Sequence, residues 1–219
     1  IPNFSVELFT CFLPWMFFAQ ALNDGTVCVA KDYLLIKKYP FPRVLLPIAS
    51  LGSNLVHLVL GFTVLLVIFV VLGVHPKLLW MVPLLTIQCC LTLGLVLLLG
   101  TLQMYYEDVR YLLNSVIQLL FFLCPTVYTI SDVLNSSRLA ELPLSNVWPD
   151  FWKEAYLLLN PLTPLFIGYR AALLHGAEWP TLPRPYFFYL GASAAWAAGF
   201  LLLGYAVWRR HEWRFAEVS

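Results

Sequence analysis

Long runs without a single Asp, Glu, Lys or Arg dominate this chain of 219 residues. Four such runs occupy residues 44–74, 78–106, 111–131 and 185–208. A fifth and less clean run covers roughly residues 6–30 and carries Asp24 towards one end. A helix needs about 20 mostly apolar residues to cross a bilayer. The sequence therefore predicts an all-α integral membrane protein with five spans.

The composition supports a membrane environment and argues against several other classes of protein. Hydrophobic residues make up 61% of the chain and charged residues 11%, whereas an average soluble domain has roughly a quarter of its residues charged. A net charge of +1 gives no electrostatic case for nucleic-acid binding. All five cysteines lie inside apolar runs, where they are expected to be small buried side chains and not a disulfide framework or metal cluster: Cys11, Cys28, Cys89, Cys90 and Cys124.

The loops between the runs predict the orientation. Residues 31–43 form a compact basic segment, and short loops rich in Lys and Arg stay on the cytoplasmic side. The turn at 75–77 and the long segment 132–184 are then outside, while residues 107–110 and the C-terminus are inside. Five spans place Ile1 outside. Because the chain opens with Ile1 and not Met, we expect a further N-terminal piece that contains one more span.

The outer segment 132–184 has an unusual pattern. It begins polar, becomes amphipathic and aromatic over residues 148–159, and continues through Asn160, Pro161 and Pro164 into an apolar run at 165–174. That run is too short to span a bilayer and follows two prolines, so it suits a re-entrant or interfacial helix.

One predicted span carries a polar and aromatic stripe. Its members alternate in steps of four and three, which places them on one helical face: Asn114, Gln118, Phe121, Pro125, Tyr128 and Asp132. Polar groups exposed to lipid are costly, so this face must contact protein or water. It lines a substrate path in a helix that Pro125 kinks, or it is a helix–helix interface joined by amide hydrogen bonds; both interpretations remain open.

Two further stripes favour helix packing over chemistry. Ser50, Asn54, His57 and Gly61 share one face, and a catalytic pairing of Ser53 with His57 lacks a nearby acid and the Gly-x-Ser-x-Gly elbow. The stripe of Gly191, Ala195 and Gly199 is a small-residue packing pattern. The sequence also contains neither a Gly-x-x-x-x-Gly-Lys-Ser/Thr segment nor a His-Glu-x-x-His motif. If the chain does work, a partner must supply the energy.

Several segments, in the order of the chain, resemble ABC-2 type permeases of the polysaccharide-export family (O-antigen, teichoic acid and capsule). They are Leu35-Ile36-Lys37-Lys38 followed by 41–47, the segment 106–110 leading to 121–128, Asn160-Pro161-Leu162-Thr163-Pro164 with Tyr169-Arg170, and 203–205 with the basic residues up to 217. The resemblance covers nearly the whole chain. It implies one transmembrane domain over residues 1–219 with a type V-like exporter fold, five spans of an expected six, and re-entrant outer gate helices.

The resemblance also implies roles for individual residues. The loop 31–43 would carry a coupling helix that docks on an ATPase through Tyr33, Leu35, Ile36, Lys37, Lys38 and Tyr39; a plain topology loop is the alternative. The translocation path would use Trp15, Phe18, Asn114, Gln118, Phe121 and Tyr128, although Trp15 and Phe18 also suit core or lipid-facing positions. The outer gate, within 132–184, would use Asn160, Pro161, Pro164 and Arg170.

We therefore expect a permease that works as a homodimer with two copies of a separate ABC ATPase in the cytoplasmic (inner) membrane of a bacterium. The cargo would be a lipid-linked glycan, the partner would bind the ATP, and the chain itself would need no cofactor or metal. An ABC-2 drug or lipid effluxer is the alternative within transport. A membrane-embedded transferase is less favoured, because Asp24, His57 and Asp132 lie at different depths.

Overall fold

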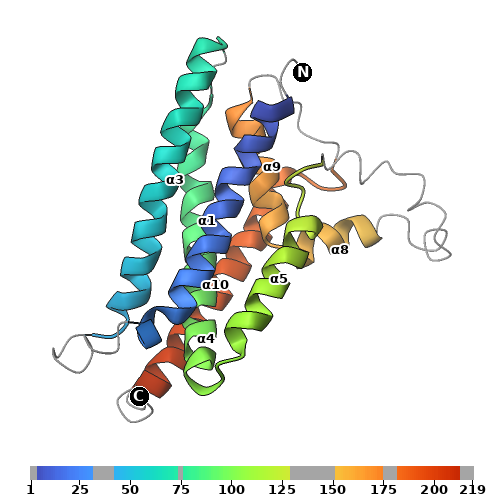
Figure 1. The fold of residues 1–219 in the computed structure, drawn as a ribbon. Helices are drawn as coiled ribbons and strands as arrows, with labels where there is room; N and C mark the ends of the chain where they lie inside the picture. The colour runs from blue at the N-terminus through green and yellow to red at the C-terminus, as the bar shows by residue number, and fades with distance from the viewer. Residues whose placement is uncertain (1–3, 32–41, 74–75, 129–150, 175–181, 213–219) are drawn as a thin grey trace.

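The computed structural model describes residues 4–31, 42–73, 76–128, 151–174 and 182–212, and all regular structure within these ranges is helical (Figure 1). The elements are α1 (Phe4–Lys31), α3 (Leu45–Val71), the 3₁₀ turn η1 (Leu78–Trp80), α4 (Met81–Tyr105), α5 (Val109–Leu123), α8 (Phe151–Leu159), α9 (Leu162–Leu173) and α10 (Tyr186–His211). The predicted all-α class is confirmed.

Three stretches are long and apolar enough to cross a membrane: α3, η1 with α4, and α10. α1, with 28 residues, and α5, with 15, are not among them. The chain is thus a multi-pass membrane protein, while the number of five spans stays a prediction.

α1 lies at the centre of the bundle and contacts α3, α4, α5 and α9. One end of the bundle gathers the end of α1, the start of α3, the turn between α4 and α5, and the end of α10 (Figure 1). There the Arg43 backbone N–H donates to Glu212 Oε1 over 3.3 Å. At the other end the Lys77 N–H donates to the Ala172 carbonyl over 2.7 Å, which joins η1 to the end of α9.

α4 and α10 pack most closely where two glycines meet. A Cβ added at Gly94 would lie 2.5 Å from the Leu201 backbone nitrogen, and one added at Gly204 would meet the Gly94 carbonyl oxygen. Small residues let helix backbones approach in this way. The stripe predicted from the sequence has no such role within the described bundle, because a Cβ added at Gly191 or Gly199 meets nothing within 4 Å.

The helix predicted over residues 111–131 ends earlier than expected. α5 stops at Leu123, and Cys124 is extended with ψ 144°. The cause is Pro125, since a proline disfavours the helical conformation of the residue before it. The prediction of a kinked helix that continues past Pro125 is therefore wrong, and Tyr128 is not on the same helix as Asn114 and Gln118.

A buried amide connects three helices in the core. The Gln88 side chain on α4 donates from Nε2 to the Pro14 carbonyl of α1 over 2.8 Å, and its Oε1 accepts from the Tyr169 hydroxyl of α9 over 2.7 Å. Gln88 and Tyr169 are both fully buried. Satisfied polar groups of this kind fix how helices align, because any other alignment would leave them unpaired.

The glycine contact between α4 and α10 can be tested by adding one methyl group. Gly94→Ala should destabilise the protein by roughly 1–3 kcal/mol, because the backbone of α10 has to move away. Thermal unfolding in detergent measures the effect. Gly199→Ala is the matched control on α10, and its unfolding should be unchanged or slightly improved. Equal unfolding temperatures for the parent chain and Gly94→Ala would contradict the packing described here.

Candidate functional site

The predicted outer gate centres on the break between α8 and α9. Asn160 lies in this break and is 7% exposed. Its Oδ1 accepts the Leu162 N–H over 3.1 Å, which holds the first turn of α9, and its Nδ2 donates to Cys124 Sγ over 3.3 Å. Pro161 follows at the N-terminal cap of α9, with φ near the value that the proline ring imposes. Asn160 and Pro161 thus start α9 and tie it to the end of α5.

Two phenols hold the C-terminal end of α5, where the last carbonyl groups lack partners within the helix. The Leu123 carbonyl accepts from the Tyr156 hydroxyl of α8 over 2.6 Å and from the Tyr128 hydroxyl over 2.9 Å. The two hydroxyls lie 3.0 Å apart. Burial raises the pKa of the Tyr156 phenol, so it stays protonated and keeps donating. α5 therefore ends against α8 through hydrogen bonds that a movement of α8 would break.

An ion pair joins α9 to the start of α1. Arg170 Nε lies 3.4 Å from Glu7 Oε1, and each side chain is 13% exposed. Arg170 Nη1 also donates to the Tyr128 carbonyl over 3.3 Å. The sequence predicted Arg170 and Tyr128 but missed Glu7. Its signal was an acid in the first turn of an otherwise apolar run.

Three of the four aromatic residues predicted for the path come together: Trp15 and Phe18 are buried, and the partly exposed Phe121 packs against Trp15. Trp15 is 4% and Phe18 2% exposed. The centroid of the Trp15 ring lies 5.5 Å from the Phe121 ring centroid and 6.3 Å from the Phe166 ring centroid. This arrangement gives Trp15 and Phe18 core positions in the described chain. Their role in a path stays a prediction.

The two predicted amides on α5 lie elsewhere. Asn114 and Gln118 are exposed, whereas their neighbours Leu113 and Ile117 are buried. The polar side of α5 is thus turned away from the bundle core, and nothing within the described chain covers it.

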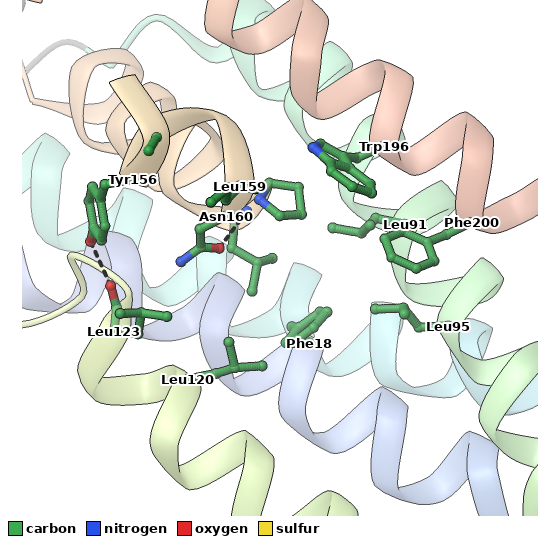
Figure 2. Close-up of a pocket in the computed structure, with 13 residues that line it drawn as sticks. Phe18, Leu91, Leu95, Leu120, Leu123, Tyr156, Leu159, Asn160, Trp196 and Phe200 are labelled. Carbon is green, nitrogen blue, oxygen red and sulfur yellow. Dashed lines mark hydrogen bonds between the residues drawn. The ribbon is translucent and has the colours of Figure 1, made fainter. Parts of the chain in front are cut away.

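An apolar cavity of about 500 Å³ lies beside the gate (Figure 2). It is lined by Phe18, Leu91, Leu95, Leu120, Leu123, Ala155, Tyr156, Leu159, Asn160, Pro161, Leu162, Trp196 and Phe200. The rings of Trp196 and Phe200 stack with their centroids 5.6 Å apart, and the Trp196 indole N–H donates to the Leu158 carbonyl over 2.8 Å. The sequence interpretation missed both residues, which are four apart on α10 and therefore neighbours on one face. Its polar side chains, Tyr156, Asn160 and Trp196, already hydrogen-bond within the protein, so the cavity suits an apolar ligand.

The coupling residues predicted from the sequence lie outside the described residues, as do 132–150 of the outer segment. They are Tyr33, Leu35, Ile36, Lys37, Lys38 and Tyr39. The structure does describe Arg43, which follows them in the chain. Arg43 contacts Glu212 at the end of α10 through its backbone and its guanidinium. Within the described ranges, no group of three or more His, Cys, Asp or Glu could hold a metal ion.

Comparison with known proteins agrees with this architecture. Two O-antigen export system permease proteins RfbA of Klebsiella pneumoniae are each 26% identical over 223 aligned residues, which cover 100% of this chain and 76% of the relative. A protein of the same name from Myxococcus xanthus is 28% identical over 175 residues, covering 78% of this chain and 61% of that protein. The profile of the family described as ABC-2 type transporter matches residues 5–139, more than half of the chain. The chain therefore belongs to the ABC-2 type transporter family, as a membrane subunit for transport.

Proposed function

We propose that this chain is the permease of an ATP-driven exporter that moves a lipid-linked glycan across the cytoplasmic membrane of a bacterium. The observation that carries the proposal is similarity along the whole chain to permeases named for O-antigen export, within a family of transporters. The exposed polar side chains of α5, Asn114 and Gln118, support it, because a glycan needs hydrogen-bonding partners on its way through the membrane.

The energy would come from two copies of a separate ABC ATPase, which binds the ATP, so that the permease needs no cofactor of its own. The basic loop 31–43 would dock there, with Leu35 and Ile36 in a groove and Lys37 and Lys38 steering the contact. The contact of Arg43 with Glu212 supports this role, since it would pass a push on the loop to both α3 and α10.

A second copy of the chain would complete the path. The exposed amides Asn114 and Gln118 need water or protein beside them, and a homodimer that encloses a path supplies both. Phe121 and Tyr128, each partly exposed, would offer stacking surfaces to sugar rings without binding them tightly.

The outer gate would consist of α8, α9 and the segment around them. Pro164 is buried in α9, and its carbonyl accepts the Tyr186 hydroxyl of α10 over 3.1 Å. With the Glu7–Arg170 pair and the Asn160 contacts, this bond holds α9 against the bundle. Exit of a glycan would require these contacts to loosen.

A drug or lipid effluxer is the second candidate, and the apolar cavity of about 500 Å³ favours it, because such a volume fits a lipid-like molecule. Both candidates would use the same ATPase contact. They differ only in the molecule that is transported, so identifying that cargo distinguishes them.

Depletion of the chain in its host should identify the cargo. We expect a lipid-linked glycan to accumulate on the cytoplasmic side while the corresponding surface glycan disappears, which extraction and compositional analysis of the membrane lipids measure. Re-expression of the chain should reverse both changes. Unchanged glycan together with new drug sensitivity would support efflux and contradict the proposed function.

The ion pair at the gate can be tested by exchanging its charges. Arg170→Glu should abolish export, because two carboxylates then face each other in a mostly buried site. The double variant Glu7→Arg with Arg170→Glu should restore part of it, measured as surface glycan. Arg184→Glu is the control, since the Arg184–Glu154 pair is more exposed and should matter little. Failure of the double variant to recover, with normal amounts in the membrane, would argue against the pair as a gate contact.

A further inference from the structure

The exposed side of α1 carries polar residues. Its exposed side chains, at intervals of seven, four, four and seven residues, form a single stripe along the helix: Phe9, Met16, Gln20, Asp24 and Lys31. Asp24 lies seven residues before Lys31, about 10 Å along the helix axis. Gln20 and Asp24, four residues apart, place an amide and a carboxylate on neighbouring turns of this central helix of a membrane protein.

The carboxylate of Asp24 is held in place by a neighbouring helix. Asn54 of α3, which is 5% exposed, donates from Nδ2 to Asp24 Oδ2 over 3.1 Å and to the Ser50 carbonyl over 3.1 Å. Gln20 Nε2 lies 3.5 Å from the same carboxylate oxygen. Asp24 remains exposed despite both contacts. It is therefore an oriented acceptor at the protein surface and not a buried structural group.

Aromatic contacts between α1 and α5 indicate where the polar residues of α5 lie relative to this stripe. Phe121 contacts Phe12 and Trp15 of α1, with ring centroids 6.5 and 5.5 Å apart. α5 starts at the end of the bundle where α1 finishes (Figure 1), so the two helices run in opposite directions. Gln118 and Asn114 precede Phe121 by about one and two turns, which brings Asn114 about level with Gln20 and leaves Asp24 one turn further along α1.

A lipid environment cannot cover such a surface, because polar and charged side chains facing hydrocarbon are costly. A dry contact with a second copy is also unfavourable. Across a two-fold axis a residue near the axis meets its own counterpart, and two Asp24 carboxylates would repel each other. Water can hydrogen-bond every polar side chain of this surface, and the hydroxyl groups of a sugar can replace those water molecules one by one.

We propose that Gln20 and Asp24 of α1 form, with Asn114 and Gln118 of α5, a hydrated wall that hydrogen-bonds the polyhydroxylated cargo, with Asn54 as the positioning residue of Asp24. This inference rests on the proposed function in glycan export. It adds a carboxylate acceptor to the path, and it assigns the wall to the exposed residues of α1 instead of the buried Trp15 and Phe18.

Accessibility to a water-soluble thiol reagent tests the wall without any transport. Gln20→Cys and Gln118→Cys would be compared, in membranes and with the ATPase present, with Val64→Cys and Leu202→Cys, which lie at 63% and 71% exposed positions on apolar surfaces of α3 and α10. The parent chain with its five native cysteines gives the background. We expect a small cationic methanethiosulfonate to modify the two wall positions several-fold faster than the two controls. Equal or slower rates would overturn the hydrated wall and leave the proposed function untouched.

Substitution of Asp24 tests its part in binding the cargo. Asp24→Asn, which keeps an acceptor, should reduce export, and Asp24→Leu should reduce it much further at equal amounts of assembled complex. Export by Asp24→Leu at the parent level would overturn the role of Asp24. If Asp24→Leu fails to assemble, Asn54→Ala and the thiol modification rates test the assignment instead. Asn54→Ala should lower export, while modification at Gln20→Cys stays fast. Normal export by Asn54→Ala would contradict the role given to Asp24.

Discussion

The buried amide of Gln88 is the interaction on which the rest of the arrangement depends. It accepts from Tyr169 and donates to the Pro14 carbonyl, in surroundings where no water can replace either partner. The position of α9 along α1 and α4 is fixed as a result. That position in turn brings Arg170 opposite Glu7 and places Asn160 beside Cys124. The geometry of the proposed gate thus follows from one satisfied side chain in the core.

The sequence predicted the apolar helices well, because the demand of a lipid environment is local and can be read from composition. α3, α4 and α10 fall within the predicted runs with small differences at their ends. The predicted end of α5 was wrong, and the reason is also local. Pro125 disfavours the helical conformation of the residue before it, and this effect outweighed the apolar pattern. The glycine contact was not predictable, since a pattern in one helix does not reveal which helix it meets. Gly94 and Gly204 meet, whereas Gly191 and Gly199 face open space.

The polar residues of the bundle fall into two groups, and burial separates them. Gln88, Asn54 and Thr92 are buried and hydrogen-bonded, so they stabilise the arrangement of helices. Gln20, Asp24, Asn114 and Gln118 are exposed and have to be covered by something other than lipid. A sequence pattern alone could not make this distinction, because both groups occupy similar positions in apolar runs.

In the proposed exporter the chain provides the path, and a partner provides the energy. Reconstitution into liposomes together with its ATPase, loaded with a lipid-linked glycan, tests this claim most directly. We expect translocation that requires both ATP and the ATPase and that is lost in the Lys37→Glu, Lys38→Glu variant. Translocation or chemical turnover by the permease alone would contradict it.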